Sequence, residues 1–373
     1  MPQLTNYHLT FPRGIHIGAG GVESVEESRE SVPSDTLFAA LLDTWRHLGR
    51  DVKEILPENG EPAFRVTSAF PFAGGVRFYP KPVDLRELFT DSRIKEFGAG
   101  KNIKKIRYLS EALIERARKG EFLDNELKKD SDDEWACKFS VQGGALWLTE
   151  AEIKELPESI LFYTDKSNGK EQKKERPLEA VMRQTVFTSQ TAPRVTVDRI
   201  SSASNLFQSE RVLFNAGCGL WFGVAQTSSL RLDFATLLAA LGDSGLGGER
   251  TASYGHFTFE PKGELPLNAP QSAAYLLSRW HPKADEVALL ANSAYKLEAV
   301  EGWLRTPENA AAQRRKRLWL VAEGSLIAGN PQGGAADVRP EYDAKSGETI
   351  AHPIYRPGFA LALDWKLKPH ERG

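Results

Sequence analysis

The sequence of 373 residues contains little cysteine. The two cysteines, Cys137 and Cys218, lie far apart, and neither they nor the seven histidines form a CxxC or HxxxH pair. These spacings argue against a structural zinc site and against a disulfide framework. We therefore expect no metal.

Long apolar runs are also missing. The first residues, MPQLTNYHLTFPRG, contain no apolar segment of the kind found in signal peptides, and no run approaches membrane-spanning length. We expect a cytoplasmic location and no membrane partner. The formal net charge is −2, so the overall charge requires neither a nucleic acid nor a membrane. A polyanionic partner would need a local basic patch.

The order of expected elements favours an α+β fold. The length suggests about two domains. Each half gives strands, a helix and more strands, without a long alternating βα series, which favours largely antiparallel sheets. The expected strands lie at 4–17, 64–82, 138–149, 211–226, 317–327 and 359–365, and the expected helices at 34–49, 84–130 and 232–245.

The stretch SDTLFAALLDTWRHLG (34–49) is the clearest helix. Its apolar residues recur at helical spacing and form one face. Ser34 is placed to cap the first turn with its hydroxyl, and Asp35 lies at the positive end of the helix dipole. Gly49 is expected to end the helix.

Glycines are concentrated in GDSGLGGERTASYGHFTF (242–259). A Walker A loop needs GxxxxGK[ST], and no Lys-Ser or Lys-Thr follows these glycines. A dinucleotide fingerprint needs GxGxxG between a strand and a helix, whereas here Arg250 replaces the last glycine and the order is reversed. We therefore expect no nucleotide cofactor.

Two interpretations of this glycine-rich stretch remain open. Bare amides bind phosphate oxygens, and Arg250 would add a charged planar fork. Alternatively, the stretch is a tight connection from helix to strand in which glycines adopt positive φ. The local sequence favours neither.

Several stretches together resemble one protein family. GLGGERTASYGHF resembles the C-terminal glycine-rich signature of the RAMP superfamily, the repeat-associated RNA-binding proteins of CRISPR systems. Three other stretches occur in the same order as in the Csm-type (type III-A) RAMP subunit that holds the 5′ handle of the crRNA, which this chain resembles. They are SDTLFAALLDTWRHLG, SAFPFAGGVRFYPKP and APRVTVDRISSASNLFQSERVLF. The resemblance spans roughly residues 4–260, and the closing HPIYRPGFALALDW agrees with the family's last strands. The equivalent subunit of Cmr complexes is the alternative.

The resemblance implies two ferredoxin-like (RNA-recognition-motif-like) RAMP domains. We place the N-terminal domain at 1–190, with a charged helical insertion at about 84–130, and the C-terminal domain at 191–373, with the glycine-rich loop at 242–255. The family's subunit is non-catalytic. Its partners are the crRNA 5′ handle, the large polymerase-like subunit and the RAMP backbone subunits, and it uses no cofactor.

Single-stranded RNA is held by phosphate contacts, base stacking and hydrogen bonds to base edges. The glycines and Arg250 form the candidate phosphate cradle, and Tyr254 is either a stacking platform or a core aromatic. By resemblance, Arg199, beside Asp198, faces the RNA; alternatively it braces its loop in an ion pair. Ser34 either lies near the RNA, as the resemblance implies, or caps the helix. The candidate RNA-binding residues are Gly245, Gly247, Gly248, Arg250, Thr251, Ser253, Tyr254, Arg199, Ser31 and Ser34.

Two other functions compete with handle binding. A repeat-cutting RAMP endoribonuclease would use a histidine, for which His47 and His16 are candidates, although the midsection VTVDRISSASNLF argues against that branch. A purely structural docking subunit would instead turn the basic stretches KNIKKIRY (101–108) and QRRKR (313–317) toward acidic partners.

Overall fold

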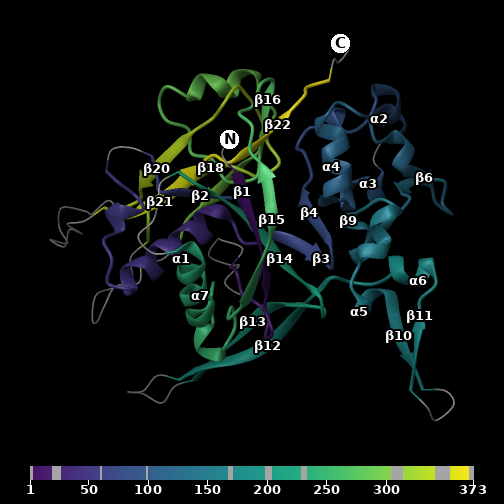
Figure 1. Ribbon diagram of the computed structural model, residues 1–373, viewed down its shortest axis with the longest axis horizontal. Helices are drawn as coiled ribbons and strands as arrows, with labels where there is room; N and C mark the ends of the chain where they lie inside the picture. Colours follow the sequence, from purple (N-terminus) through teal and green to yellow (C-terminus); the bar gives the residue numbers. More distant parts are fainter. Residues whose placement is uncertain are drawn as a thin grey trace.

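The computed structural model describes residues 3–18, 27–58, 61–97, 100–166, 171–197, 204–227, 233–302, 304, 314–340 and 353–368. Helices and mostly antiparallel strands are mixed along the chain (Figure 1). The α+β class expected from the sequence is therefore confirmed. No helix in these ranges is both long enough and apolar enough to cross a membrane.

A ferredoxin-like unit forms the centre of the molecule. Its strands lie in the order β15-β1-β14-β3, all antiparallel, which is the arrangement of a βαββαβ fold. Helices α1 and α7 belong to the same unit and contact each other. Its elements in chain order are β1 (Gln3–Thr10), α1 (Ser34–His47), β2 (Phe64–Val66), β3 (Phe70–Ala73), β14 (Cys218–Gln226), α7 (Phe234–Ser244) and β15 (Thr258–Pro266).

Helices and sheet of this unit share an aromatic core. Tyr7 of β1 stacks on Phe222 of β14 at 5.6 Å between ring centroids and lies 5.7 Å from Phe234 of α7. Most of the apolar face expected on the helix at 34–49 is buried, including Leu41 and Trp45, whereas Leu48 at its end is exposed. Burying such side chains is the main favourable term in folding.

The start of α1 differs from the expected capping arrangement. Ser34 is the first helical residue, Pro33 occupies the N-cap position, and no side chain caps the helix. The Ser34 hydroxyl instead accepts a hydrogen bond from the backbone N–H of Arg279 at 2.8 Å. The capping role expected for Ser34 is therefore wrong, because a contact 245 residues away along the chain uses the hydroxyl.

The sheet crosses the domain boundary expected at residue 190. β1 pairs with β14 and β15, so strands from both sides of that residue share one sheet. The ferredoxin-like unit spans 3–266 as a discontinuous whole, and the elements between β3 and β14 are inserted into it. A division at residue 190 stays a prediction.

The elements of the insertion from α2 to α6 lie to one side of the central unit, in blue and teal at the right of Figure 1, whereas the β12–β13 ribbon extends below the centre. The stretch 84–130, expected to be helical, is broken by buried strand β5, which pairs antiparallel with β4 and parallel with β9. The inserted elements are β4 (Val76–Pro80), α2 (Asp91–Phe97), α3 (Lys101–Lys105), β5 (Tyr108–Ser110), α4 (Glu111–Arg118), β6 (Leu127–Lys129), β7 (Trp135–Cys137), β8 (Ser140–Val141), β9 (Leu146–Trp147), α5 (Glu158–Leu161), β10 (Phe162–Asp165), β11 (Gln172–Glu175), α6 (Leu178–Met182), β12 (Phe187–Val197) and β13 (Ser204–Phe214).

The chain after residue 266 adds small sheets. β16 lies between β19 and β22, and buried Trp280 and Ile327 belong to a core of their own. The strands are β16 (Ala273–Leu276), β17 (Leu297–Val300), β18 (Leu318–Val321), β19 (Leu326–Ala328), β20 (Gly333–Asp337), β21 (Tyr355–Phe359) and β22 (Ala362–Trp365).

Buried charges join this last segment to the start of α1. The Asp35 side chain is fully buried, lies 3.4 Å from Arg279 and forms an ion pair with Arg356. Arg356 also donates to the Thr36 hydroxyl at 3.0 Å. Because buried charges are tolerated only when paired, this network holds the C-terminal segment against α1.

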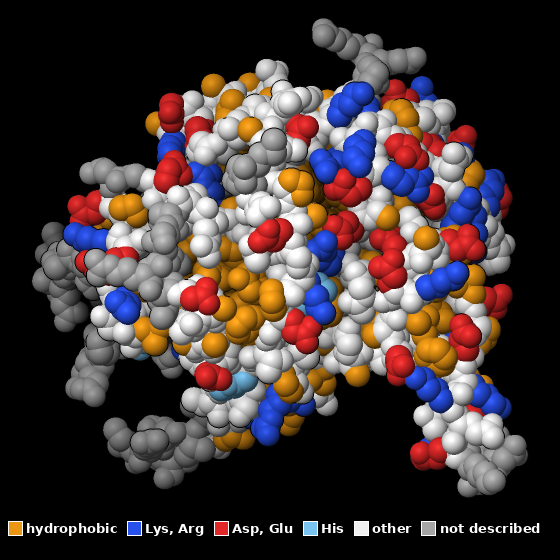
Figure 2. Space-filling view, viewed as in Figure 1, with side chains coloured by type: hydrophobic (Ala, Val, Ile, Leu, Met, Phe, Trp, Pro, Cys, Tyr) orange, Lys and Arg blue, Asp and Glu red, His pale blue; other side chains and the backbone are white. Residues whose placement is uncertain are grey.

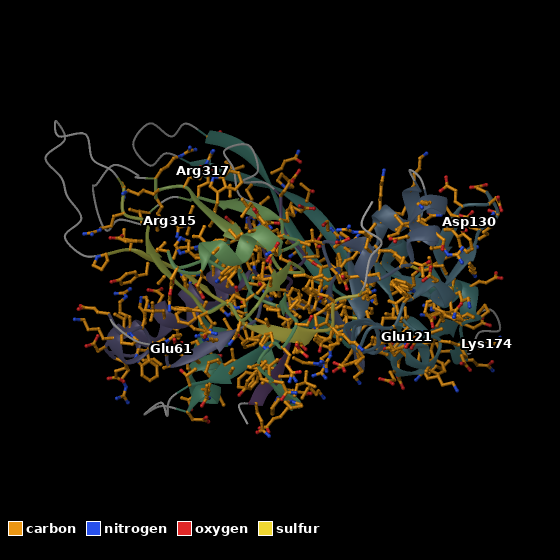
Figure 3. All side chains as sticks on the ribbon, turned by 90° about the horizontal axis from the view of Figure 1, so that it is seen from above. Glu61, Glu121, Asp130, Lys174, Arg315 and Arg317 are labelled. Carbon is orange, nitrogen blue, oxygen red and sulfur yellow. The ribbon has the colours of Figure 1, made fainter. Side chains whose placement is uncertain are left out.

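The two basic stretches lie on different parts of the molecule. KNIKK forms α3 with Ile103 buried, so its lysines lie on an exposed helix face. In Figure 3, Arg315 and Arg317 lie at the opposite end of the molecule from the insertion, which Asp130 and Lys174 mark. Arg317 pairs with Glu301 at 2.8 Å.

Candidate functional site

The glycine-rich loop runs from the end of α7 to the start of β15. Helix α7 ends at Gly245, and a short 3-10 helix covers Arg250–Ala252. Gly248 N–H donates to the carbonyl of His16 at 2.9 Å, and Gly255 N–H donates to the carbonyl of Gly14 at 2.9 Å. The loop is therefore fastened to the segment that follows β1.

The chain itself approaches the loop backbone closely. At Gly247, where φ is +93°, an added Cβ would lie 2.3 Å from the His16 carbonyl oxygen. At Gly255, where φ is +75°, it would lie 2.0 Å from the carbonyl oxygen of Leu246. These two glycines are required by the protein's own packing, as the tight-connection interpretation expects.

The amides of the candidate phosphate cradle are partly engaged. Gly245 N–H donates to the Leu241 carbonyl at 2.8 Å, and Gly248 N–H donates to His16. Phosphate binding through these amides would compete with bonds already made. Binding of RNA by the glycine backbone stays a prediction, and the Arg250 side chain becomes the stronger candidate in the loop.

Arg250 lies between two hollows. One, of about 740 Å³, separates the ends of α1 and α7 and includes Arg46 and His47; we call it the helix hollow. The other, of about 680 Å³, includes Gly248 and Thr251; we call it the loop hollow. Within the ranges the structure describes, no carboxylate pairs with Arg250. A cation between two hollows without an ion-pair partner suits an anionic ligand.

The surface beside these hollows is partly apolar. Figure 2 shows hydrophobic side chains gathered on the face where Figure 1 places α1 and α7. Leu48, just after α1, is 44% exposed and lines the helix hollow. The Arg250 guanidinium therefore has both polar and apolar surroundings, as a site for nucleotides requires.

Tyr254 lies beneath two arginines of the β12–β13 ribbon. Its ring is 6% exposed, and its hydroxyl accepts a hydrogen bond from Arg194 at 2.9 Å. The guanidinium carbons of Arg194 and Arg211 lie 5.2 and 4.9 Å from the ring centroid. These cation–π contacts match the alternative of a buried aromatic. Stacking of an RNA base on Tyr254 stays a prediction.

The other loop candidates lie beside Arg250. Thr251 is exposed and lines the loop hollow, and Ser253, half-buried, adopts a positive φ of +65°. Glu249 also has a positive φ, of +54°. Positive φ in residues other than glycine is costly and is often found at binding sites.

The remaining candidates lie elsewhere. Ser31 lines a different cavity, together with Lys81 and Tyr108, and Ser34 is buried at the start of α1. Arg199 falls outside the residues that the structure describes. The structure thus gathers the loop candidates but not the two serines.

Both histidines proposed for catalysis border the loop. Nδ1 of buried His16 lies 2.5 Å from the Glu210 carbonyl oxygen. His47 is exposed, and its Nδ1 lies 2.8 Å from the Asp43 carbonyl oxygen. Arg194 in β12 and Arg211 in β13 were not expected as site residues, because only the tertiary fold brings them onto the ring of Tyr254.

The chain is similar to proteins of one CRISPR family. Residues 269–365 match the family model described as CRISPR Csm4 C-terminal domain. The CRISPR system Cms protein Csm4 of Mycobacterium tuberculosis (strain CDC 1551 / Oshkosh) is 26% identical over 366 residues, 96% of this chain and 97% of that protein. The protein of the same name from Thermococcus onnurineus (strain NA1) is 25% identical over 308 residues, 82% of this chain and 84% of that protein. The chain is thus similar to Csm4 proteins over almost its whole length.

One solved structure has a similar fold. The chain is similar to one in the crystal structure of the Csm3–Csm4 subcomplex in the type III-A CRISPR-Cas interference complex, with a TM-score of 0.59 and 17% identity, covering 97% of this chain and 100% of the other. The two share a fold. The Csm-type RAMP resemblance noted in the sequence is therefore confirmed.

Proposed function

We propose that this chain is a non-catalytic RNA-binding subunit of a type III-A CRISPR complex. It anchors the 5′ handle of the crRNA and connects the large polymerase-like subunit with the RAMP backbone subunits. The match to Csm4 proteins over almost the whole chain carries this proposal. A relative of the same fold occurs in a subcomplex with Csm3, which supports the contact with backbone subunits.

Within this function, Arg250 is the residue that we propose to hold a handle phosphate. It is a cation without an ion-pair partner in the ranges that the structure describes, and it separates the helix hollow from the loop hollow. Thr251 beside it offers an exposed hydroxyl. Phosphate contacts of this kind fix the position of a strand and make its binding depend on salt.

Arg250→Ala tests the site. In the full-length chain we expect weaker binding of a labelled handle RNA, with the slope of log K against log salt reduced by about 0.7, the value for one phosphate contact on a single strand. Fluorescence anisotropy over a salt series measures both quantities. Lys119→Ala is the control, since Lys119 is an exposed cation directly after α4 in the insertion. Equal slopes for Arg250→Ala and the unmodified chain would overturn the assignment of Arg250.

The proposal contains no cleavage step. Repeat RNA incubated with the full-length chain should stay intact, and His47→Ala should leave that result unchanged. Metal-independent cleavage that disappears in His47→Ala would replace this proposal with the endoribonuclease alternative. Crosslinking to RNA bases separates handle binding from purely structural docking, because only the former gives adducts.

A further inference from the structure

A further cavity, separate from the helix hollow and the loop hollow, lies where three parts of the chain meet; we call it the junction cleft. Its volume is about 630 Å³. Lys81 and Lys104 come from the insertion, Ser31 from the segment before α1, and Lys296 and Glu323 from the C-terminal segment. Cavities of this volume accept ligands of the size of a nucleotide.

Main-chain contacts hold the junction cleft open. Lys81 N–H donates to the Arg107 carbonyl at 2.8 Å, and Val83 N–H donates to the Gly324 carbonyl at 3.0 Å. At Gly324, where φ is +82°, an added Cβ would lie 2.5 Å from the Lys81 carbonyl oxygen. The C-terminal segment therefore packs directly on the chain that follows β4, and the cleft exists before a ligand enters.

The carboxylates that line the junction cleft are already paired with cations. Each has an arginine or lysine within ion-pair distance, so none is left over for the remaining lysines. The pairs are Glu30 with Arg107 at 3.0 Å, Glu298 with Arg29 at 3.1 Å, with Lys296 at 3.1 Å and with Arg279 at 2.5 Å, and Glu323 with Arg279 at 3.6 Å.

Lys81 and Lys104 are the remaining cations. Neither has a carboxylate partner among the residues that the structure covers. Lys81 is half-buried, and its burial lowers the pKa of its ammonium group below the usual value. A buried ammonium without a counter-charge is unfavourable, and an anion in the cleft would supply the missing charge. Beside the lysines, Pro82 and the 40% exposed Val83 offer apolar surface for a ribose or a base.

We propose that the junction cleft binds the phosphate of a nucleotide through Lys81 and Lys104. An RNA strand and a free nucleotide share this chemistry. With RNA as the source, the inference rests on the proposed function and gives the complex a second contact, separate from Arg250. Ser31, expected near RNA from the sequence, lines this cleft rather than the glycine-rich loop.

The test compares two double variants of the full-length chain. Lys81→Ala/Lys104→Ala removes both cleft cations, whereas Lys101→Ala/Lys105→Ala makes the same change in charge with two lysines of α3 that do not line the cleft. Handle RNA is titrated by anisotropy over a salt series, and AMP, ATP and inorganic phosphate are titrated by calorimetry.

Either of two results supports the cleft. If RNA is the ligand, the cleft variant binds handle RNA at least tenfold more weakly than the control, and its salt slope falls by about 1.4, the value for two single-strand phosphate contacts. If a free nucleotide is the ligand, the cleft variant loses AMP or ATP binding while its RNA affinity equals that of the control.

Equal RNA affinity and slope, and equal nucleotide binding, in the two double variants would overturn the cleft proposal. The proposed function would still hold after that result if the unmodified chain binds handle RNA and Arg250→Ala weakens this binding. Conversely, an unmodified chain that binds no handle RNA but binds ATP in the cleft would refute the proposed function and keep the cleft. Lys104→Glu, at an exposed position, repeats the test without changing half-buried Lys81.

Discussion

Replacing Gly247 with alanine separates packing from RNA contact in the glycine-rich loop. Gly247 has a φ of +93°, and its added Cβ would lie 2.3 Å from the His16 carbonyl oxygen. The left-handed backbone costs an alanine about 1–2 kcal/mol. Relief of the overlap requires a shift of backbone, which adds about 1–3 kcal/mol. We therefore expect Gly247→Ala to lower the free energy of unfolding by about 2–5 kcal/mol.

Gly263→Ala is the matched control for this prediction. Gly263 has a φ of +80°, but nothing lies within 4 Å of its added Cβ, so only the backbone cost of about 1–2 kcal/mol applies. Urea denaturation of both variants, followed by tryptophan fluorescence, measures the difference. The packing argument would be refuted if Gly247→Ala had at least the unfolding free energy of Gly263→Ala but bound handle RNA poorly. That result would favour a direct approach of RNA to Gly247.

Three further predictions concern buried charges and Tyr254. Asp35→Ala leaves Arg279 and Arg356 without a buried partner and should cost about 3–5 kcal/mol in urea denaturation, whereas the exposed Asp43→Ala should cost less than about 0.5; similar values for both would contradict the buried network. Burial, together with Arg77 and Lys262, lowers the pKa of His8 to about 4. The unfolded chain then binds more protons than the folded one between pH 6.5 and 4, so stability should fall as the pH falls through this range, and His8→Leu should flatten the profile; an unchanged profile would refute it. Tyr254→Phe removes the acceptor for Arg194 and should cost about 0.5–1.5 kcal/mol, with handle RNA affinity kept if the ring is a core aromatic; a large loss of affinity at unchanged stability would indicate base stacking instead.

The local elements could be predicted where the periodicity is strong. The helix expected at 34–49 occurs as α1, Gly49 follows its end with a φ of +75°, and the strands expected at 64–82 occur as β2, β3 and β4. These features depend on neighbours within a few residues, so a single sequence contains the information. The role of Ser34 was wrong because its partner, Arg279, lies 245 residues away.

The pairing of β1 with β14 and β15 was not visible in the sequence. Adjacent strands in a sheet are usually neighbours in the chain, whereas here more than two hundred residues separate β1 from its partners. Each half of the chain gives strands, a helix and more strands, and the resembling family has two ferredoxin-like domains. The boundary expected at residue 190 followed from these two observations.

The sequence located the glycine-rich loop but not its contacts. Positive φ at Gly247 and Gly255 agrees with the tight-connection interpretation, yet the backbone atoms that approach these two glycines come from His16 and Leu246 and depend on the tertiary fold. That Arg250 has no ion-pair partner among the described residues likewise follows from three-dimensional placement. The junction cleft was not visible in the sequence. The segment PKP predicted only a turn, because the other walls of the cleft come from distant parts of the chain.

A pull-down of the tagged chain from its native host, with the bound RNA sequenced and the bound proteins identified, decides whether the chain binds the crRNA handle. We expect RNAs that share one short 5′ sequence followed by diverse spacers, together with a large polymerase-like subunit and RAMP backbone subunits. Uncut repeat RNA, or no RNA at all, would contradict the handle-binding function.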